Sequence, residues 1–365
     1  MAFAAGPAVE LMWDRWMGRA LQLAGLAEGL TSPNPLVGAV VLDATGDLVG
    51  EGFHARAGQA HAEVGALLQA GEAARGGTLI VSLEPCCHHG RTPPCTEAVI
   101  EAGIQRVVIA LEDPDPRVGG AGITRLKDAG IEVICGVLRD EAAAQNCAFL
   151  HRVSTGRPLG FLKWAMSLDG RTALPNGASQ WISGSEARRF VHQLRARCDA
   201  VIVGGGTVRS DNPLLTSRGR RSPEPLRVVL SRSLDLPDQA QLWDTSVAPT
   251  LIAHGPDLVD AGAPSGPERL VLRRSDPLQL MEALAKRGCN RVLWECGPEL
   301  STQAIQQGCV QQIAAVVAPK LMGGLAAKTP LGDLGYKAMD QVLQLESPQW
   351  SALGDDLLFQ ASSPG

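Results

Sequence analysis

Short apolar runs alternate along this chain with segments of helical period, and this alternation constrains the fold more than any other feature. Thr78–Ser82 and Arg106–Leu111 are such runs in the first half, and Ala200–Val203 and Leu226–Leu230 are such runs in the second. Strands that alternate with helices pair in parallel and need helices on both faces of the sheet. The pattern therefore predicts an α/β fold, with one series of elements before Ser154–Pro158 and another after it.

The length of the chain supports two domains. It has 365 residues, whereas a single hydrophobic core rarely grows beyond about 250–300 residues. The stretch STGRP has the composition of a linker. We predict a tail at 1–12, a first domain at 13–153, the linker at 154–158 and a second domain at 159–361. The first should have three layers and a mixed sheet.

Hydrophobic period and the positions of glycine and proline predict the individual elements. In the first domain we expect helices at Asp14–Ala27, His61–Leu68, Pro93–Ile100, Thr124–Ala129 and Asp140–Arg152. Its strands are expected at Pro35–Leu42, Leu48–Phe53, Thr78–Ser82, Arg106–Leu111 and Glu132–Gly136. In the second domain we expect strands at Leu159–Ala165, Ala200–Val203, Leu226–Leu230, Thr250–Ala253, Arg291–Glu295 and Gln312–Ala318, and helices at Ser185–Ala196, Pro277–Arg287 and Glu299–Gln307.

Composition argues against several classes of partner. The net charge is −5 and only 4% of the residues are aromatic, with a single tyrosine, so the chain lacks the basic surface and stacking platforms of nucleic-acid-binding proteins. The first residues, MAFAAGPAVELMWDRW, lack the basic start and apolar run of a signal peptide. No apolar run reaches the ~18 residues of a membrane span. We expect a cytoplasmic protein that binds neither nucleic acid nor membrane.

A histidine, a glutamate and two cysteines are spaced as in a catalytic zinc site. His61-Ala62-Glu63 is followed by Pro85-Cys86 and, after eight further residues, by Cys95. Histidine nitrogen and thiolate sulfur are good Zn²⁺ ligands, and zinc with three protein ligands lowers the pKa of its bound water to about 7. Glu63 can then move protons without ligating, as in zinc deaminases. We predict one zinc ion per chain, held by His61, Cys86 and Cys95.

A closed structural zinc site is the main alternative. Such a site needs a fourth protein ligand, and Cys87, His88 and His89 are available. A structural site has no use for the carboxylate of Glu63, which favours the catalytic interpretation. The other cysteines are expected to pack as small apolar residues. They are Cys135, Cys147, Cys198, Cys289, Cys296 and Cys309.

Taken together, these motifs resemble those of the bifunctional deaminase–reductase of bacterial riboflavin biosynthesis. The likeness runs from about Met12 to Phe359 and includes the first-domain segments Pro33–Gly38, Gly52–His54, His61–Glu63 and Glu84–Cys95. The eight-residue gap between the cysteines distinguishes this family from deaminases with the P-C-x-x-C spacing. The resemblance implies a cytidine-deaminase-like first domain.

By that resemblance, the substrate is a diaminopyrimidinone carrying a ribosylamino 5-phosphate, whose ring amine is hydrolysed to give a uracil. Asn34, His54, Arg91 and Asp113 are expected to line the pocket, with Arg91 opposite the phosphate. Each of these residues also has a structural alternative, which stays open. Asn34 can be a turn residue, and His54 a structural histidine whose hydrogen bonds are made within the protein. Arg91 can belong to a surface ion pair, and Asp113 can cap a loop. The family usually has asparagine where this chain has Asp115. A carboxylate there would repel phosphate, so we leave Asp115 out of the site.

The second domain resembles the reductase half of the same family, which is similar in fold to dihydrofolate reductase and uses NADPH. The matching segments are Lys163–Arg171, Ser179–Ser183, Leu194–Arg195, Gly204–Pro213 and Glu295–Glu299. The resemblance implies NADPH contacts at Ala165, Trp181, Thr207, Asp211, Ser231, Gly297, Pro298, Glu299, Leu300, Ser301, Thr302 and Gln303. It implies contacts to the ribosylamino substrate at Lys163, Ser179, Arg195, Leu215, Arg218 and Glu295, with Arg195 and Arg218 as phosphate partners.

Two local features of the second domain agree with a bound cofactor. Gly204–Gly206 follow an apolar strand, where a ligand can approach the backbone closely. Glu295–Pro298 precede a helix whose first N–H groups can receive a phosphate. Each feature alone is also common in turns that join a strand to a helix, whether or not a ligand binds there.

The prediction is a bifunctional enzyme that deaminates the pyrimidine at the zinc site and then reduces the ribose side chain with NADPH to the ribityl product. Its partner is a small phosphorylated pyrimidine, and the resemblance implies a homo-oligomer. An RNA-acting deaminase and a non-catalytic zinc-stabilised binding protein are the alternatives.

Overall fold

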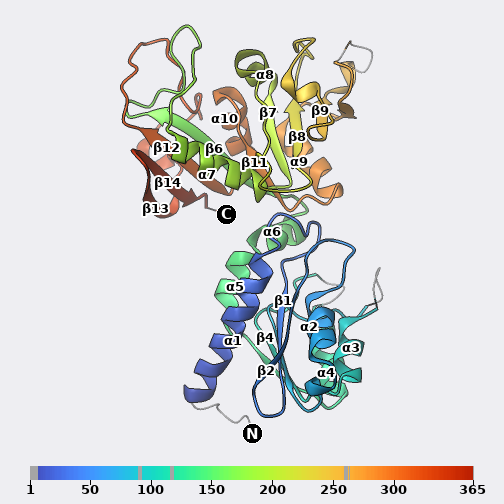
Figure 1. Cartoon of the computed structure of the whole chain (residues 1–365). Helices are drawn as coiled ribbons and strands as arrows, with labels where there is room; N and C mark the ends of the chain where they lie inside the picture. Colours follow the sequence, from blue (N-terminus) through green and yellow to red (C-terminus); the bar gives the residue numbers. More distant parts are fainter. Residues whose placement is uncertain (1–6, 89–92, 116–118, 259–261, 263, 365) are drawn as a thin grey trace. The chain divides into compact units, whose positions relative to one another are not determined.

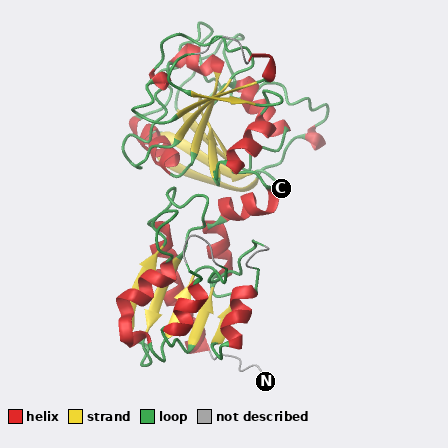
Figure 2. Ribbon diagram, turned by 90° about the vertical axis from the view of Figure 1, so that its right-hand side faces the viewer, coloured by secondary structure: helices red, strands yellow, loops and turns green. Residues whose placement is uncertain are grey.

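The computed structural model describes residues 7–88, 93–115, 119–258, 262 and 264–364. By internal contacts the chain divides into two units, Met1–Thr155 and Gly156–Gly365. Each unit has its own sheet with helices on both faces (Figures 1 and 2). Of the helices in these described ranges, none combines the length and the apolar character needed to cross a lipid bilayer.

The first unit contains a five-stranded mixed sheet. Its helices are α1 (Pro7–Gly25), α2 (Ala62–Ala70), α3 (Cys95–Glu101), α4 (Ala121–Asp128), α5 (Arg139–Gln145) and α6 (Cys147–Thr155), with a short 3₁₀ helix at Gly71–Ala74. Its strands are β1 (Gly38–Leu42), β2 (Leu48–Phe53), β3 (Thr78–Val81), β4 (Arg106–Ile109) and β5 (Glu132–Cys135). The order is β2-β1-β3-β4-β5, in which β1 runs antiparallel to β2 and β3 and the last three strands are parallel.

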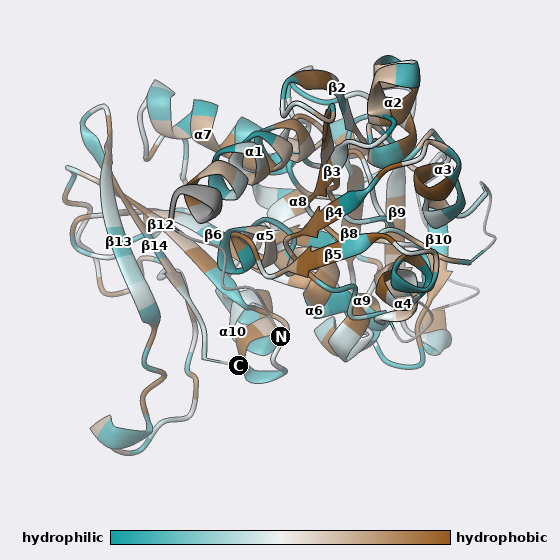
Figure 3. Cartoon of the chain, turned by 90° about the horizontal axis from the view of Figure 1, so that it is seen from below, coloured by the Kyte–Doolittle hydropathy of each residue, from teal (hydrophilic) through white to brown (hydrophobic). Residues whose placement is uncertain are grey.

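Alternate residues of the central strands bury opposite faces of this sheet. Val41 and Leu79 belong to a core shared with α2, α3 and α4, whereas Val40 and Ile80 belong to a core shared with α1 and α5. That period of two is expected for strands covered on both sides. Figure 3 shows the resulting hydrophobic colouring of β3, β4 and β5. The unit is the three-layer domain that the sequence predicts.

Glycine on β2 brings α2 into direct contact with the sheet. A Cβ atom added at Gly52 would lie 2.4 Å from the carbonyl oxygen of Ala62, and one at Gly50 would lie 2.1 Å from that of Ala66. Only glycine permits such an approach of two backbones. The start of α2, where the predicted residues His61 and Glu63 lie, is thereby held against the strand.

Three expectations for the first unit are wrong in detail. The helix expected to begin at Asp14 begins at Pro7 instead, because proline is tolerated in a first helical turn and strong helix formers follow it. The strand expected from Pro35 starts at Gly38, since proline has no N–H to donate to the sheet. The helical stretch Asp140–Arg152 is two helices, α5 and α6.

Asn146 explains the break between those two helices. It is buried between them, and its side-chain amide accepts a hydrogen bond from Leu36 N (2.8 Å) and donates one to Leu36 O (2.9 Å). The asparagine thus ties the chain entering β1 to the α5–α6 junction. Helix α6 then continues to Thr155, so the first two residues of the expected linker at 154–158 are helical.

The second unit contains a nine-stranded sheet. Its helices are α7 (Ser185–Ala196), α8 (Gly205–Asp211), α9 (Pro277–Lys286) and α10 (Pro298–Gln306), with short 3₁₀ helices at Gln241–Trp243, Pro256–Leu258 and Met339–Gln341. Its strands are β6 (Leu159–Ser167), β7 (Ala200–Gly204), β8 (Leu226–Leu230), β9 (Thr250–His254), β10 (Glu268–Val271), β11 (Arg291–Trp294), β12 (Gln312–Ala318), β13 (Glu346–Leu353) and β14 (Asp356–Ser362). The order is β10-β9-β8-β7-β11-β6-β12-β14-β13, in which the hairpin β13–β14 is antiparallel and the other seven strands are parallel.

Two cores flank this sheet. Helices α9 and α10 pack on residues such as Ile202 and Val228, and α7 and α8 pack on the alternate residues Val201 and Val229. The elements α8, β10, β13 and β14 are missing from the sequence-based expectations. Helix α8 starts with two glycines, and β13 is exposed along nearly its whole length, so neither carries the hydrophobic period on which prediction depends.

The cysteines outside the zinc motif fit their expected role in part. Cys198, Cys289 and Cys309 are buried, and Cys147 and Cys296 are half-buried. Cys135 is exposed, which corrects the prediction that it packs in a core. The reason is its place on β5, the outermost strand of the first sheet, whose residues are only partly covered.

Candidate active sites

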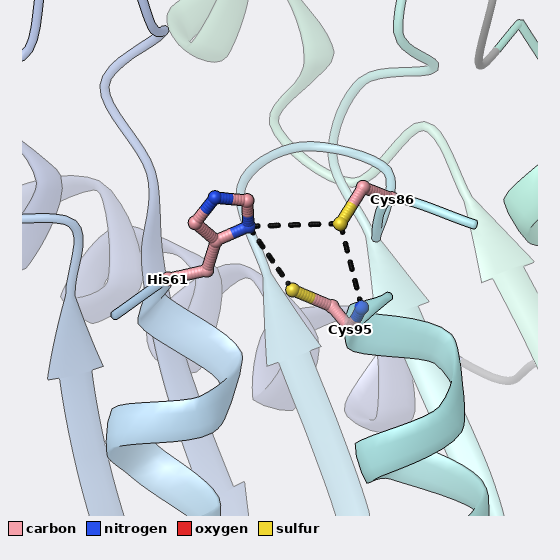
Figure 4. A group of neighbouring side chains, drawn as sticks. All are labelled: His61, Cys86 and Cys95. Carbon is pink, nitrogen blue, oxygen red and sulfur yellow. Dashed lines mark hydrogen bonds between the residues drawn. The ribbon is translucent and has the colours of Figure 1, made fainter. Parts of the chain in front are cut away.

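His61, Cys86 and Cys95 come together from three separate elements of the first unit. His61 is the residue just before α2, Cys95 is the first residue of α3, and Cys86 lies in the loop that follows β3. Their side chains point toward one another (Figure 4). His61 Nδ1 lies 3.1 Å from Cys95 Sγ and 3.6 Å from Cys86 Sγ. All three ligand atoms lie within 4.8 Å of one another.

This donor set fits a tetrahedral zinc ion. With bonds of about 2.0–2.3 Å, neighbouring ligand atoms in such a site lie roughly 3.3–3.8 Å apart, close to the distances seen here. The hydrogen bond from Cys95 and the nearby His61 lower the pKa of the Cys86 thiol to about 4. The hydrogen bond with Cys86 raises the pKa of the Cys95 thiol, together with burial. A divalent cation bound here would favour the deprotonated form of both thiols.

A fourth protein ligand is not found among the residues that the structure describes. No further histidine, cysteine, aspartate or glutamate of the described ranges joins the group of three. Cys87 is half-buried and stands outside it, and His88 is exposed. His89 lies outside the described residues. A site with three protein ligands has a coordination place for water, as a catalytic zinc site requires.

Glu63 lies on the first turn of α2, beside the three ligands. It is buried, and burial raises the pKa of its carboxyl to about 7. It lies close enough to Cys95 for each group to affect the pKa of the other. A carboxyl that titrates near neutral pH can both accept and return a proton, which a hydrolytic step requires.

A cavity of about 450 Å³ in the first unit borders on Glu63 and on two of the three candidate ligands. Its wall includes three of the four predicted substrate residues, Asn34, His54 and Asp113, as well as His61, Glu63 and Cys86. The fourth, Arg91, lies outside the described residues. The wall also includes Asp115, which sequence reasoning left out of the site, and residues of α6 that no motif indicated.

Asn34 and His54 form an ordered pair in this wall. His54 Nδ1 lies 3.1 Å from the carbonyl oxygen of Ala60, which can only accept, so Nδ1 carries the proton. Its Nε2 therefore accepts from Asn34 Nδ2 at 3.0 Å. Burial lowers the pKa of His54, which keeps the ring neutral. The side-chain amide of Asn34 consequently has one fixed orientation, with its Nδ2 toward His54.

Glu84 is a positioning residue that sequence reasoning did not single out. Its buried carboxylate accepts hydrogen bonds from the backbone N–H groups of Asp113 (3.1 Å), Gly120 (3.0 Å) and Ile123 (3.1 Å). It therefore caps the N-terminus of α4, whose own N-cap residue, Gly120, has no side chain to do so. Glu84 precedes Cys86 by two residues, so one carboxylate joins the metal-site loop to the wall that contains Asp113.

Replacing Glu84 with glutamine should destabilise the first unit by about 1.5–3 kcal/mol. The glutamine side chain lacks the negative charge, and its NH2 group would face backbone N–H groups, which cannot accept a hydrogen bond. The KM of the deamination that the motifs predict should rise as the Asp113 wall loosens. Denaturant unfolding and steady-state kinetics measure both. The matched control is Glu97→Gln, which removes an exposed ion pair with Arg125 and should cost less than about 1 kcal/mol. Equal effects of the two substitutions would contradict this role of Glu84.

Several of the residues predicted for the second domain lie at or just beyond the carboxyl ends of its parallel strands. Lys163 and Ala165 are on β6, Ser231 follows β8, and Glu295 follows β11. Thr207 and Asp211 lie on α8, directly after β7, and Ser179 Oγ donates to Asp211 Oδ1 at 3.3 Å. Trp181 is exposed, with the guanidinium of Arg188 over its ring. The segment from Gly297 to Gln303 is the N-cap and start of α10. Ligands of open α/β sheets bind at this edge.

Arg195 and Glu295 form a buried ion pair at the same edge. Arg195 Nε and Nη2 donate to the two carboxylate oxygens of Glu295 at 2.6 and 2.9 Å, and Nη1 donates to Thr216 O at 3.0 Å. Burial would raise the pKa of Glu295, but the charge and hydrogen bonds of Arg195 outweigh it, so the pKa lies below its usual range. Burial lowers the pKa of Lys163, which also faces this pair. His192 of α7 is a further neighbour that the motifs did not indicate.

The loop that carries Leu215 and Arg218 is held by a buried arginine. Leu215 and Arg218 both have positive φ angles, 57° and 58°; Leu215 is buried and Arg218 is exposed. Arg227 is fully buried on β8, and it donates to backbone carbonyl oxygens that include those of Leu214 (3.4 Å) and Leu242 (3.0 Å). The loop thus has a defined conformation beside Thr216, the partner of Arg195.

Comparison with known proteins assigns both halves of the chain. Residues 12–111 match the cytidine and deoxycytidylate deaminase zinc-binding region, and residues 158–359 match the RibD C-terminal domain. The riboflavin biosynthesis protein RibD of Synechocystis is 51% identical over 348 residues, which cover 94% of each chain. The chain belongs to the RibD family of riboflavin-biosynthesis enzymes.

Solved structures of RibD proteins agree with this assignment. RibD of Acinetobacter baumannii is 39% identical with a TM-score of 0.88, covering 98% of this chain and 100% of its own. A diaminohydroxyphosphoribosylaminopyrimidine deaminase/5-amino-6-(5-phosphoribosylamino)uracil reductase of Thermotoga maritima is 34% identical with a TM-score of 0.87, covering 98% and 100%. The predicted family and α/β fold class are confirmed. As a RibD protein, the chain is a bifunctional deaminase and reductase that acts on small substrates, with a zinc-binding deaminase domain and a reductase domain of the NADPH-using type.

Proposed function

We propose that the first domain hydrolyses the ring amine of 2,5-diamino-6-(5-phosphoribosylamino)pyrimidin-4(3H)-one, and that the second reduces the resulting 5-amino-6-(5-phosphoribosylamino)uracil with NADPH. The observation that carries this proposal is the convergence of His61, Cys86 and Cys95 beside the buried Glu63, in a cavity large enough for a nucleotide-sized ligand. The domain bounds proposed are 13–153 and 159–361, joined by 154–158.

In the deamination, the C–N bond to the ring amine breaks, ammonia leaves, and water supplies the oxygen of the new carbonyl group. His61, Cys86 and Cys95 would hold the zinc ion, and the ion would supply water activation at neutral pH. Glu63 accepts a proton from the attacking water and returns it to the leaving amine. Asn34, oriented by His54, and Asp113 contact the substrate, and Arg91 meets its phosphate.

In the reduction, a hydride passes from NADPH to C1′ of the opened ribose imine, and a proton is added to the imine nitrogen. Ala165, Trp181, Thr207, Asp211, Ser231 and the segment Gly297 to Gln303 bind the cofactor. Their common place at the carboxyl edge of the sheet supports this assignment. Lys163, Ser179, Arg195, Leu215, Arg218 and Glu295 bind the ribosylamino substrate.

Incubation of the protein with the diaminopyrimidinone phosphate tests both halves in one experiment. Without NADPH, we expect the product mass of the deaminated uracil. With NADPH, we expect a further gain of two hydrogens. A substrate mass unchanged in both conditions would refute the deaminase proposal, and an unreduced uracil in the presence of NADPH would refute the reductase proposal.

We further propose a homo-oligomer in the cytoplasm. Strand β13 is an exposed edge strand with Trp350 64% exposed against Phe359 of β14, and such edges usually pair or are covered. The nine cysteines, all of which lie in the described ranges, form no disulfide bond, as expected in a reducing compartment. A molar mass of a single chain in solution would contradict the first proposal, and recovery of the protein outside the cytoplasm would contradict the second.

A further inference from the structure

The cavity of the first unit is rich in carboxyl groups. Glu63, Glu84, Asp113 and Asp115 all belong to its wall, and the only lysine or arginine among the described residues of that wall is Arg152. A phosphate monoester carries a charge of about −1.5 to −2 at neutral pH. Binding of such a group in this surrounding calls for a cation in addition to Arg91, the predicted phosphate partner, and neither the motifs nor the family comparison assigns Arg152 a role.

Arg152 reaches the cavity from helix α6. Phe149, Arg152 and Val153 all line the wall, and residues spaced by three and four lie on one face of a helix. The Cζ atom of Arg152 lies 5.9 Å from the centre of the Phe149 ring. The side chain is half-buried, and Arg152 belongs to the wall of the cavity.

The guanidinium is anchored beside the predicted substrate residues. Arg152 Nη2 donates to the carbonyl oxygen of Pro33 at 2.8 Å, and Pro33 directly precedes Asn34. A guanidinium has five N–H donors in a planar fork, so it can hold this carbonyl and a phosphate oxygen at the same time. The contact fixes the cation on the rim where Asn34 and His54 lie.

We propose that Arg152 binds the phosphate group of the deaminase substrate and so makes the first domain selective for phosphorylated pyrimidines. This inference rests on the proposed deaminase function. The alternative is that Arg152 only fastens the Pro33 loop to α6. The two roles predict different effects of replacing Arg152. If the role is only structural, every substrate is affected equally, whereas if Arg152 binds phosphate, only substrates that have a phosphate group are affected.

Deamination kinetics with the substrate and with its dephosphorylated form distinguish them. Arg152→Gln should raise KM for the phosphorylated form by about 10- to 100-fold, the equivalent of one charge-assisted hydrogen-bonded contact. Its kcat, and its KM for the dephosphorylated form, should change little. Arg152→Lys keeps the charge and should retain most of the selectivity. Arg125→Gln, an exposed arginine of the same unit, is the matched control and should behave as wild type.

An equal rise in KM for both substrates, or no rise for either, would overturn the inference. Direct binding of ribose 5-phosphate, measured by calorimetry, gives a readout that needs no turnover. Wild type and Arg125→Gln should bind it at two sites, one in each domain, whereas Arg152→Gln should keep the second-domain site and bind at the first-domain site at least about tenfold more weakly. Equal binding by all three proteins would refute the role of Arg152, whereas wild-type binding without any deaminated product would refute the proposed reaction and not this contact.

Discussion

Replacement of Glu63 with glutamine should abolish deamination while zinc stays bound. The amide keeps the size of the side chain but can neither accept nor return a proton, and loss of a general acid–base group costs about 10²- to 10⁴-fold in rate. His61, Cys86 and Cys95 are untouched, so metal analysis should give one zinc ion per chain, as in wild type. Product mass after incubation with the diaminopyrimidinone measures the deamination.

The second domain supplies an internal control for this variant. When the deaminated uracil is provided directly, Glu63→Gln should reduce it with NADPH at the wild-type rate, because Glu63 and the reductase residues belong to different units. Deamination at the wild-type rate would contradict the assigned proton transfer. Loss of zinc together with deaminase activity would mean that Glu63 is needed to keep the metal bound and would not support its role in proton transfer.

Replacement of Arg195 with alanine should have the largest effect on the second domain. It leaves the carboxylate of Glu295 buried without its bidentate partner, and loss of one member of a buried ion pair destabilises a protein by about 3–5 kcal/mol. Reductase activity should fall, with a raised KM for the uracil substrate. Denaturant unfolding and steady-state kinetics measure the two effects.

A double variant separates stability from binding. Replacing both Arg195 and Glu295 with methionine removes both charges at similar volume, and should recover much of the stability lost in the single variant. It should not recover activity. Arg189→Ala, which breaks an exposed pair with Glu186 on the same helix, is the control and should cost less than about 1 kcal/mol. A double variant with wild-type KM would show that the ion pair has no part in substrate binding.

The Arg195–Glu295 pair also predicts a dependence of stability on pH. The pKa of Glu295 is lowered in the native state, so the unfolded chain binds its proton more readily. The pair therefore contributes stability above the unfolded pKa of about 4.3, and this contribution is lost as the pH falls through the native value. In Arg195→Ala that acid-labile part of the stability should be smaller.

The fold class and the family could be predicted from the sequence because both depend on short local patterns and motifs. Ile80 and Leu79 are an example. They are neighbours in one short apolar run, which predicts a strand buried on both faces, and their side chains belong to two different cores. Elements without such a period were missed. Helix α8 begins with glycines, for which the sequence predicted a close approach of a ligand but no helix, and β13 is exposed on both faces.

The candidate zinc ligands could be named in advance because their residue types and spacing already define the chemistry, although their roles stay predictions. The positions of Glu84 and Arg152 at the site could not be predicted, and Asp115 was left out of the site although it belongs to the cavity wall. The role of Glu84 depends on backbone N–H groups some 30 to 40 residues later in the chain. Nothing in the local sequence distinguishes Arg152 from other helix residues, and its position beside Pro33 depends on the packing of α6. Such contacts depend on tertiary packing, which no local pattern contains.

X-ray absorption at the zinc edge of the active enzyme would show whether three side chains and one water molecule bind the metal. We expect one zinc ion per chain with two sulfur ligands, one imidazole nitrogen and one light atom from water. A third sulfur, which would place Cys87 on the metal, would contradict it, as would full deaminase activity in protein that contains no zinc.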